Sequence, residues 1–120
     1  MKNTLLILAL IVFSCKTTQI LPDPLEAGWE GEKVCEVLSD TKTQRVLKCV
    51  FPPNVGHQKH YHKPHFGYTI AGSTFQITDK KGTKNIPVVT GASWTKTELS
   101  EHEVFNVGDS TAVFLIIEPK

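Results

Sequence analysis

The chain has 120 residues, which suits one ordinary domain and is too short for a second hydrophobic core. Its 13 Lys and Arg residues nearly balance its 12 Asp and Glu residues, so the chain lacks the net positive charge that is typical of nucleic-acid-binding proteins. We therefore expect a single globular domain without a nucleic-acid partner.

The first residues indicate export. Lys2 precedes an apolar run from Leu5 to Phe13, far shorter than the roughly 20 residues that span a bilayer. A serine and Cys15 follow and resemble a bacterial lipobox, although Phe13 is bulkier than usual. We expect residues 1–14 to be a lipoprotein-like signal peptide and Cys15 to carry a lipid, so that the protein is membrane-anchored and faces the periplasm or the cell exterior. A plain secretory signal or a short uncleaved anchor is the alternative.

Residues 15–31 are rich in proline and glycine, which predicts a linker ahead of a domain over residues 32–120. Within the domain, Cys35 and Cys49 lie in two apolar runs separated by turn-prone residues, and they would face each other if the hairpin turns near residue 42. A disulfide would suit an oxidising compartment. The alternative is a pair of buried thiols that merely pack.

The domain is predicted to be all-β. No stretch shows helical apolar periodicity, whereas short runs rich in Val, Ile, Thr and Phe recur between turn signals. The expected strands are about 33–38, 44–51, 58–62, 66–71, 73–79, 85–89, 93–97, 102–107 and 111–118. This spacing indicates a sandwich or barrel. The last run is apolar without alternation, which predicts burial on both faces, in the sheet core or under a partner subunit.

The histidines are the most informative feature. Four of the five lie between residues 57 and 65, and His102 follows some forty residues after His62. Residues two apart on a strand share a face, so His60 and His62 present two imidazoles to one side, as a metal site requires. The same spacing also occurs on solvated strands, so it does not establish a metal site alone.

The segment from Asn54 to Gly72 resembles the first sequence motif of the cupin family: a glycine, five residues, His-x-His, three or four residues, a glutamate, six residues and a glycine. Asn54 stands in place of the first glycine and is tolerated in a left-handed turn. His65 occupies the register of the glutamate, which is a departure from the family pattern.

The second cupin motif is matched from Gly91 to Asn106 without insertion, with His102 and Asn106 in place and Thr97 and Leu99 replacing the usual proline and glycine. The resemblance implies a single-domain cupin β-barrel of the double-stranded β-helix or jelly-roll type. It also implies a metal held by His60, His62 and His102, with His65 as a fourth candidate.

Imidazole ligands favour iron, zinc, nickel or copper over magnesium or calcium. The export signal places the protein in the cell envelope. The resemblance implies that it binds or acts on a small molecule, with a metal-dependent dioxygenase favoured and an isomerase or lyase also compatible. A non-catalytic module that binds a small ligand or a metal is the rival, because no evident general base lies beside the ligands.

Further roles are expected by analogy. Tyr68, Trp94 and Phe105 would line the pocket, with Tyr68 orienting a substrate, although core packing is the alternative for each. His57 is expected to contact solvent rather than metal. A nearby carboxylate, from Glu98, Glu101 or Glu103, could orient a ligand imidazole, although exposed carboxylates are the ordinary case. A homodimer is compatible with the apolar last strand.

Overall fold

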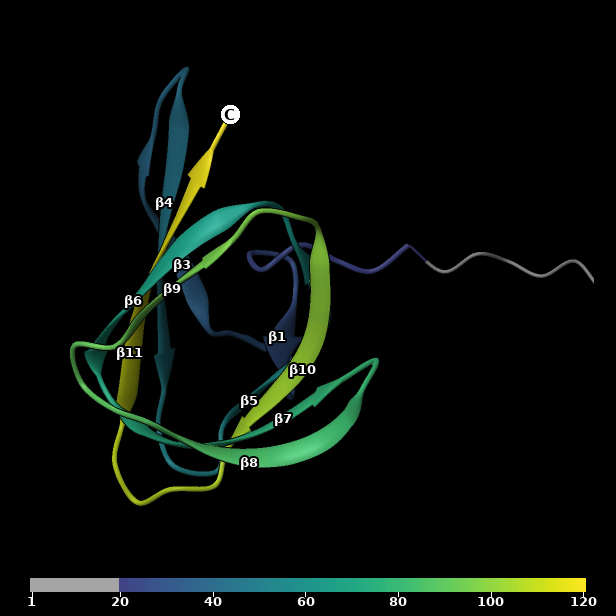
Figure 1. Ribbon diagram of the computed structural model, residues 1–120, viewed down its shortest axis with the longest axis vertical. Coiled ribbons are helices and arrows are strands. Elements are labelled where there is room, and N and C mark those ends of the chain that lie inside the picture. Colours follow the sequence, from purple (N-terminus) through teal and green to yellow (C-terminus); the bar gives the residue numbers. More distant parts are fainter. Residues whose placement is uncertain (1–19) are drawn as a thin grey trace, which may run out of the picture.

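The computed structural model describes residues 20–120 (Figure 1). The predicted signal peptide and Cys15 lie outside the described residues. The strands are β1 (Gly28–Trp29), β2 (Glu32–Lys33), β3 (Cys35–Asp40), β4 (Gln44–Phe51), β5 (Gly56–His62), β6 (His65–Ala71), β7 (Ser73–Asp79), β8 (Gly82–Val88), β9 (Ser93–Lys96), β10 (Ser100–Asn106) and β11 (Ala112–Pro119). The all-β prediction is confirmed, and each of the nine predicted strands corresponds to one of β3 to β11.

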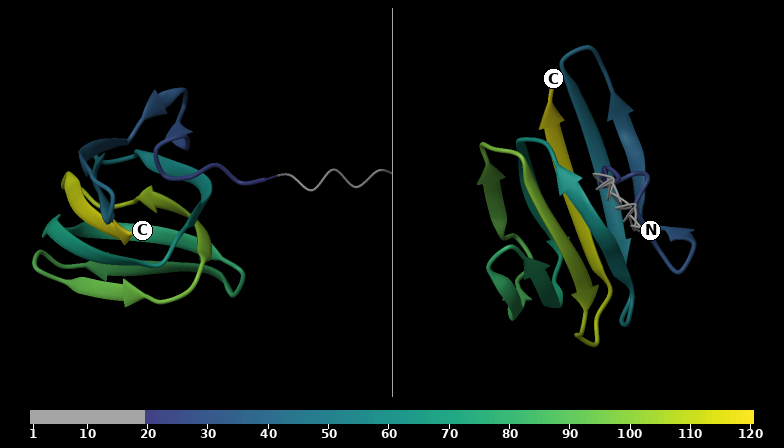
Figure 2. Two further views of the ribbon diagram at one scale, coloured as in Figure 1. Left: turned by 90° about the horizontal axis from the view of Figure 1, so that it is seen from above. Right: turned by 90° about the vertical axis from the view of Figure 1, so that its right-hand side faces the viewer.

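Two antiparallel sheets face each other and form the barrel (Figure 2). One sheet has the order β5-β10-β7-β8, and the other has the order β3-β4-β11-β6-β9. Neighbours in a sheet are often distant in sequence, as where β11 lies between β4 and β6. This jelly-roll arrangement brings the histidines of β5 beside the histidine of β10. Within residues 20–120, no helix is long and apolar enough to cross a membrane.

Alternating side chains build the core between the sheets. On β11, Ala112, Phe114 and Ile116 point inward and are buried, whereas the outward Val113 and Leu115 are only partly buried. The prediction that this strand is buried on both faces is therefore wrong for the single chain. β11 has a hydrogen-bonded neighbour strand on each edge, β4 and β6, and its outer face is apolar but only partly covered.

The hairpin of β3 and β4 pairs Cys35 directly opposite Cys49, and a disulfide joins the two residues. Two other local features follow the sequence motifs. Asn54 has a left-handed backbone with φ of 65°, in the turn before β5. Gly72 has no room for a side chain, because a Cβ there would lie 2.1 Å from the carbonyl oxygen of Val88.

The segment before residue 32 corrects the predicted domain boundary. It was expected to be a linker, but its strand β1 pairs with β2 in a short hairpin, and Ala27 is buried against the barrel. The backbone N–H of Tyr61 on β5 also donates to the carbonyl oxygen of Pro22. The folded domain therefore includes residues from Pro22 onward, at least ten residues before the predicted boundary.

Candidate metal centre

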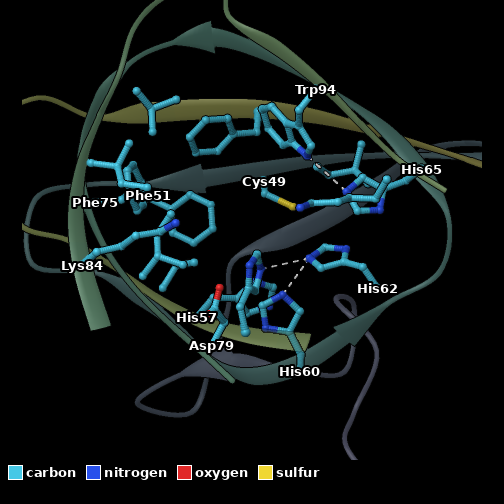
Figure 3. Close-up of a pocket in the computed structure, with 18 residues that line it drawn as sticks. Cys49, Phe51, His57, His60, His62, His65, Phe75, Asp79, Lys84 and Trp94 are labelled. Atoms are coloured by element: carbon cyan, nitrogen blue, oxygen red, sulfur yellow. Dashed lines mark hydrogen bonds between the residues drawn. The ribbon is translucent and has the colours of Figure 1, made fainter. Parts of the chain in front are cut away.

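A cavity of about 310 Å³ lies between the two sheets (Figure 3). Its walls are mainly apolar and aromatic, and histidines gather on one side. The residues that line it are Cys49, Phe51, His57, His60, His62, His65, Phe75, Ile77, Asp79, Lys84, Ile86, Val88, Trp94, Lys96, His102, Val104, Phe114 and Ile116. A mostly apolar pocket with a few convergent polar groups is the usual form of a small-molecule site.

Three histidines converge at this side of the cavity. His60 and His62 come from β5, and His102 on β10 stands directly opposite His60 in the strand register. The Nε2 atoms of His60 and His62 are 2.9 Å apart, and those of His62 and His102 are 3.2 Å apart. The ligand atoms of all three lie within 4.8 Å of one another. The fold therefore brings together the two parts of the sequence that were predicted to form the site.

The protonation of these rings suits a metal ligand. Nδ1 of His60 donates to the carbonyl oxygen of Gln58 at 2.6 Å, which leaves the lone pair on Nε2. Burial, followed by the neighbouring histidines, lowers the pKa of His102 to about 3 and also lowers the pKa of His62. Burial lowers the pKa of His60 as well. All three imidazoles are therefore neutral near pH 7, as metal binding requires.

The geometry fits a transition-metal ion. Nitrogen ligands that share an ion at about 2.0–2.1 Å lie roughly 3 Å from one another at tetrahedral or octahedral angles. The Nε2 separations of 2.9 Å between His60 and His62 and of 3.2 Å between His62 and His102 agree with this. Nδ1 of His62 is buried without a hydrogen-bond partner. No protein group at Nδ1 therefore holds the ring in a tautomer that would keep Nε2 from binding a metal.

His65, the fourth candidate ligand, lies outside this group of three. Its Nδ1 donates to the carbonyl oxygen of Lys63, and its Nε2 accepts a hydrogen bond from the indole N–H of Trp94 at 3.2 Å. Trp94 reaches it because Gly67 offers a flat surface: a Cβ on Gly67 would lie 2.2 Å from the indole ring. Both ring nitrogens of His65 are thus engaged by the protein, and His65 lines the cavity beside His62.

His57 was expected to face solvent, but this prediction is wrong: its side chain is 2% exposed. His57 and His60 are three residues apart, yet both point inward because the register of β5 against β10 shifts between them, as in a β-bulge. Nε2 of His57 donates toward the carbonyl oxygens of Pro24 at 3.1 Å and Ala27 at 3.3 Å. Its ring packs against His60 at 3.9 Å between centroids.

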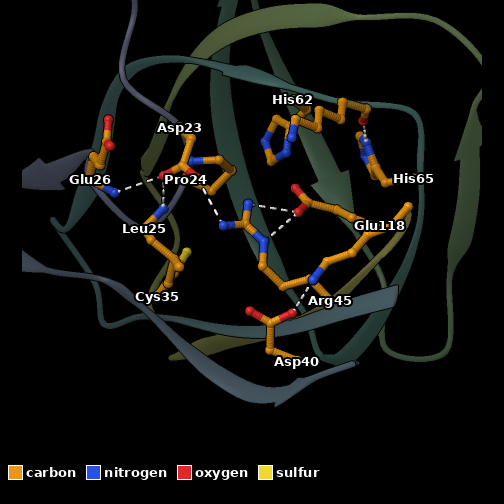
Figure 4. Close-up of polar contacts among 12 residues, drawn as sticks. Asp23, Pro24, Leu25, Glu26, Cys35, Asp40, Arg45, His62, His65 and Glu118 are labelled. Atoms are coloured by element: carbon orange, nitrogen blue, oxygen red, sulfur yellow. Dashed lines mark hydrogen bonds and ion pairs between the residues drawn. The ribbon is translucent and has the colours of Figure 1, made fainter. Parts of the chain in front are cut away.

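An ion-pair network fixes the segment that carries Pro24 and Ala27 (Figure 4). Arg45 on β4 donates to Asp23 at 2.9 Å and to Glu118 on β11 at 2.7 Å. Asp23 in turn accepts hydrogen bonds from the backbone N–H groups of Leu25 and Glu26. Burial opposes the charge on Arg45, but the hydrogen bonds that it donates to both carboxylates raise its pKa overall. The N-terminal segment is therefore built into the wall behind the histidines.

Two predicted pocket residues face outward instead. Tyr68 is exposed and does not line the cavity, because His65 and Gly67 on the same strand take the inward positions. Phe105 lies beside the inward Val104 and stacks outside the cavity on Trp29, with ring centroids 5.4 Å apart. Of the three predicted aromatic lining residues, only Trp94 lines the cavity.

The carboxylates near His102 do not orient a ligand ring. Glu101 lies instead near the ammonium groups of Lys59 and Lys80, at 3.7 and 4.0 Å. The backbone carbonyl of Gln58 performs the orienting role for His60.

Sequence reasoning also missed the charged residues of the cavity wall, because only the strand register places Lys84 and Asp79 on the inner face.

No family model matches the chain, and no curated protein matches it either. Solved structures do match. A cupin domain from Bordetella pertussis Tohama I aligns with a TM-score of 0.68 and 24% identity, over 85% of this chain and 98% of that one. The polyketide cyclase RemF from Streptomyces resistomycificus aligns with a TM-score of 0.58 and 18% identity, over 71% of this chain and 63% of that one. A predicted oxalate decarboxylase from Thermotoga maritima aligns with a TM-score of 0.54 and 17% identity, over 72% of this chain and 79% of that one.

These identities show the fold alone, and the predicted cupin barrel is confirmed. Three histidines in such a barrel could bind a metal.

Proposed function

We propose that this chain is a divalent-metal-binding cupin protein that binds or acts on a small molecule in the barrel cavity. The observation that carries the proposal is the convergence of three neutral histidine nitrogens on the wall of a mainly apolar cavity. His60, His62 and His102 would hold the ion. With no carboxylate among them, iron, zinc, nickel and copper fit better than magnesium or calcium.

A bound ion of this kind would supply Lewis acidity and, if it were iron or copper, redox chemistry. The protein's own residues prepare the site for it. The carbonyl of Gln58 holds the ring of His60 in the tautomer that presents Nε2. Phe51, Phe75 and Phe114 pack edge to face and form an apolar wall of the cavity. The apolar part of a small molecule would pack against this wall.

Among the enzymes compatible with this site, a dioxygenase is favoured, and an isomerase or lyase is the other option. A non-catalytic binding module is the second candidate, and one observation favours it. Asp79 is the only carboxylate among the cavity residues, and the ring nitrogens of His65 already bond to protein groups. An obvious general base beside the three histidines is therefore missing from the described part of the chain.

We further propose that the protein acts outside the cytoplasm, held to a membrane by a lipid on Cys15. The disulfide between Cys35 and Cys49 supports an oxidising compartment, since such bonds persist mainly in exported proteins. Globomycin, which blocks lipoprotein signal cleavage, and a Cys15→Ser variant would test the anchor. Globomycin should make a larger, uncleaved precursor accumulate, and Cys15→Ser should no longer incorporate labelled palmitate. A wild-type chain that incorporates no palmitate would contradict lipidation.

Elemental analysis of protein purified without nickel affinity steps tests the metal site. We expect one equivalent of a transition metal per chain. His60→Ala and His102→Ala should each abolish stoichiometric binding, because each removes one of three ligands. His65→Ala is the matched control and should retain the metal, since both of its ring nitrogens bond elsewhere. A folded wild-type chain that holds no metal after metal is supplied would overturn the proposal.

A turnover measurement distinguishes the metal-dependent enzyme from the non-catalytic binding module. Metal-loaded protein would be screened for oxygen uptake with small thiols and diols. Consumption of a compound that depends on His102 would support an enzyme. A compound that raises the melting temperature but is never consumed would support the binding module.

A further inference from the structure

The cavity has two chemically different regions. Away from the three histidines, its wall is formed by aromatic and branched aliphatic side chains: Phe51, Phe75, Ile86, Val88, Trp94 and Phe114. These residues come from both sheets, so a molecule in the cavity would contact apolar groups on opposite sides. A cavity of about 310 Å³ lies at the small end of ligand pockets. The cavity therefore suits a compact molecule with an apolar body.

The charged residues of the cavity are unbalanced. Lys84 and Lys96 line it, and Asp79 is the only acidic residue that does. Neither lysine belongs to an ion pair with any residue of the described chain, so no carboxylate of the protein neutralises either charge. A divalent ion on neutral histidines would add to this positive charge.

The strand arrangement places the two lysines at the solvent side of the cavity. Lys84 lies on β8 and Lys96 on β9, which are the edge strands of the two sheets. Lys96 pairs opposite His65, and Lys84 pairs opposite Ile77, so both stand on inward-facing positions. Both residues are nevertheless exposed, which places them at an opening. Figure 3 shows the side chain of Lys84 extending toward the interior.

We propose that the cavity takes a small organic carboxylate with an apolar aliphatic or aromatic body. This inference rests on the proposed function and names its substrate class. The carboxylate is met by the lysines and the metal, and the body lies against the aromatic wall. A phosphate ester is a poorer match, because the only arginine, Arg45, is occupied by two carboxylates outside the cavity. Arginine is the residue that binds such groups bidentately.

Titration calorimetry with 3-phenylpropanoate, its neutral amide and acetate tests this, using the chain both metal-free and loaded with cobalt. The carboxylate should bind at least about tenfold more tightly than the amide, because hydrogen bonds to a charged group are stronger. Acetate should bind more weakly than 3-phenylpropanoate, since it leaves the apolar wall uncovered.

Lys84→Met and Lys96→Met should each weaken carboxylate binding about two- to fivefold without changing amide binding, as expected for partly solvated charges. Lys81→Met, in the turn before β8 and outside the cavity, is the matched control and should change neither. Cobalt binding should survive in all three variants.

The outcomes separate the two proposals. If cobalt binds but the amide binds as well as the carboxylate, or if both lysine variants match the control, the carboxylate proposal is overturned and the metal site stands. If cobalt does not bind but the metal-free chain still prefers the carboxylate through its lysines, the metal proposal fails and the carboxylate proposal stands.

Discussion

Replacing Asn106 should destabilise the barrel strongly, because this buried side chain uses its whole hydrogen-bonding capacity. Its Nδ2 donates to the carbonyl oxygens of Phe51 and Ser110, both at 2.8 Å. Its Oδ1 accepts from the hydroxyl of Ser73 at 2.8 Å and from the backbone N–H of Gly108 at 3.0 Å. One fully buried amide thus connects the end of β10 to β4, β7 and the loop before β11.

The magnitude follows from these four bonds. Each intramolecular hydrogen bond contributes about 1 kcal/mol net, and a buried group left without a partner costs more. Asn106→Ala should therefore lower the free energy of unfolding by about 4 kcal/mol, a large part of the roughly 5–15 kcal/mol typical of a domain. Ser73→Ala removes only one of the four bonds and should cost about 1 kcal/mol.

Urea unfolding followed by tryptophan fluorescence measures both effects under oxidising conditions. Trp29 and Trp94 report on the two sides of the barrel wall, since one packs outside on Phe105 and the other lines the cavity. A loss below about 1 kcal/mol for Asn106→Ala, or a loss equal to that of Ser73→Ala, would refute the additive hydrogen-bond reasoning.

Three further effects are expected in the same assay. Arg45→Met should cost about 3–5 kcal/mol, because it leaves Glu118, which is 3% exposed, as a buried charge without a partner. Replacing Cys35 and Cys49 together by alanine should cost about 3 kcal/mol, the value for a loop of this length. Burial lowers the pKa of His57 from 6.5 to about 3. Its contribution to the stability of the metal-free chain is therefore present above pH 6.5 and lost as the pH falls toward 3, and His57→Gln should flatten that part of the pH profile.

Each of these effects has its own control or contrary outcome. Lys48→Met removes a cation from an exposed pair with Glu36 and should cost below about 1 kcal/mol, so an equal loss for Arg45→Met would contradict the buried-charge argument. Reducing agent should destabilise the wild-type chain but not the double cysteine variant. A pH profile that is identical in His57→Gln and wild type would show that this histidine is not the group that resists protonation.

Most of the barrel could be predicted because its strands carry local signals. The β-branched and aromatic runs and the turns between them located β3 to β11 within a few residues. The first hairpin was missed for a physical reason. Proline and glycine around residues 22–31 carry no strand pattern, and β1 and β2 have only two residues each. What orders this segment is tertiary: Arg45 binds Asp23, and His57 binds the carbonyls of Pro24 and Ala27.

The cavity lysines could not be predicted for a related reason. Lys84 and Lys96 lie in polar stretches that are indistinguishable from solvated edge strands. Their inward direction depends on the register of β8 against β7 and of β9 against β6, which long-range pairing fixes. The outward direction of Tyr68 is the converse case, because the strand that puts His65 and Gly67 inside must turn Tyr68 outside.

The bulge in β5 explains how one strand supplies histidines to two different tasks. Without a register shift, His57 would face away from His60, because the two are an odd number of residues apart. The shift turns all three histidines of β5 inward. Only His60 and His62 share a group with His102, since Nε2 of His57 is directed to the carbonyls of the N-terminal segment. The ring of His57 then packs on His60 and supports it from behind, so the segment expected to be a linker becomes part of the wall that holds a metal ligand in place.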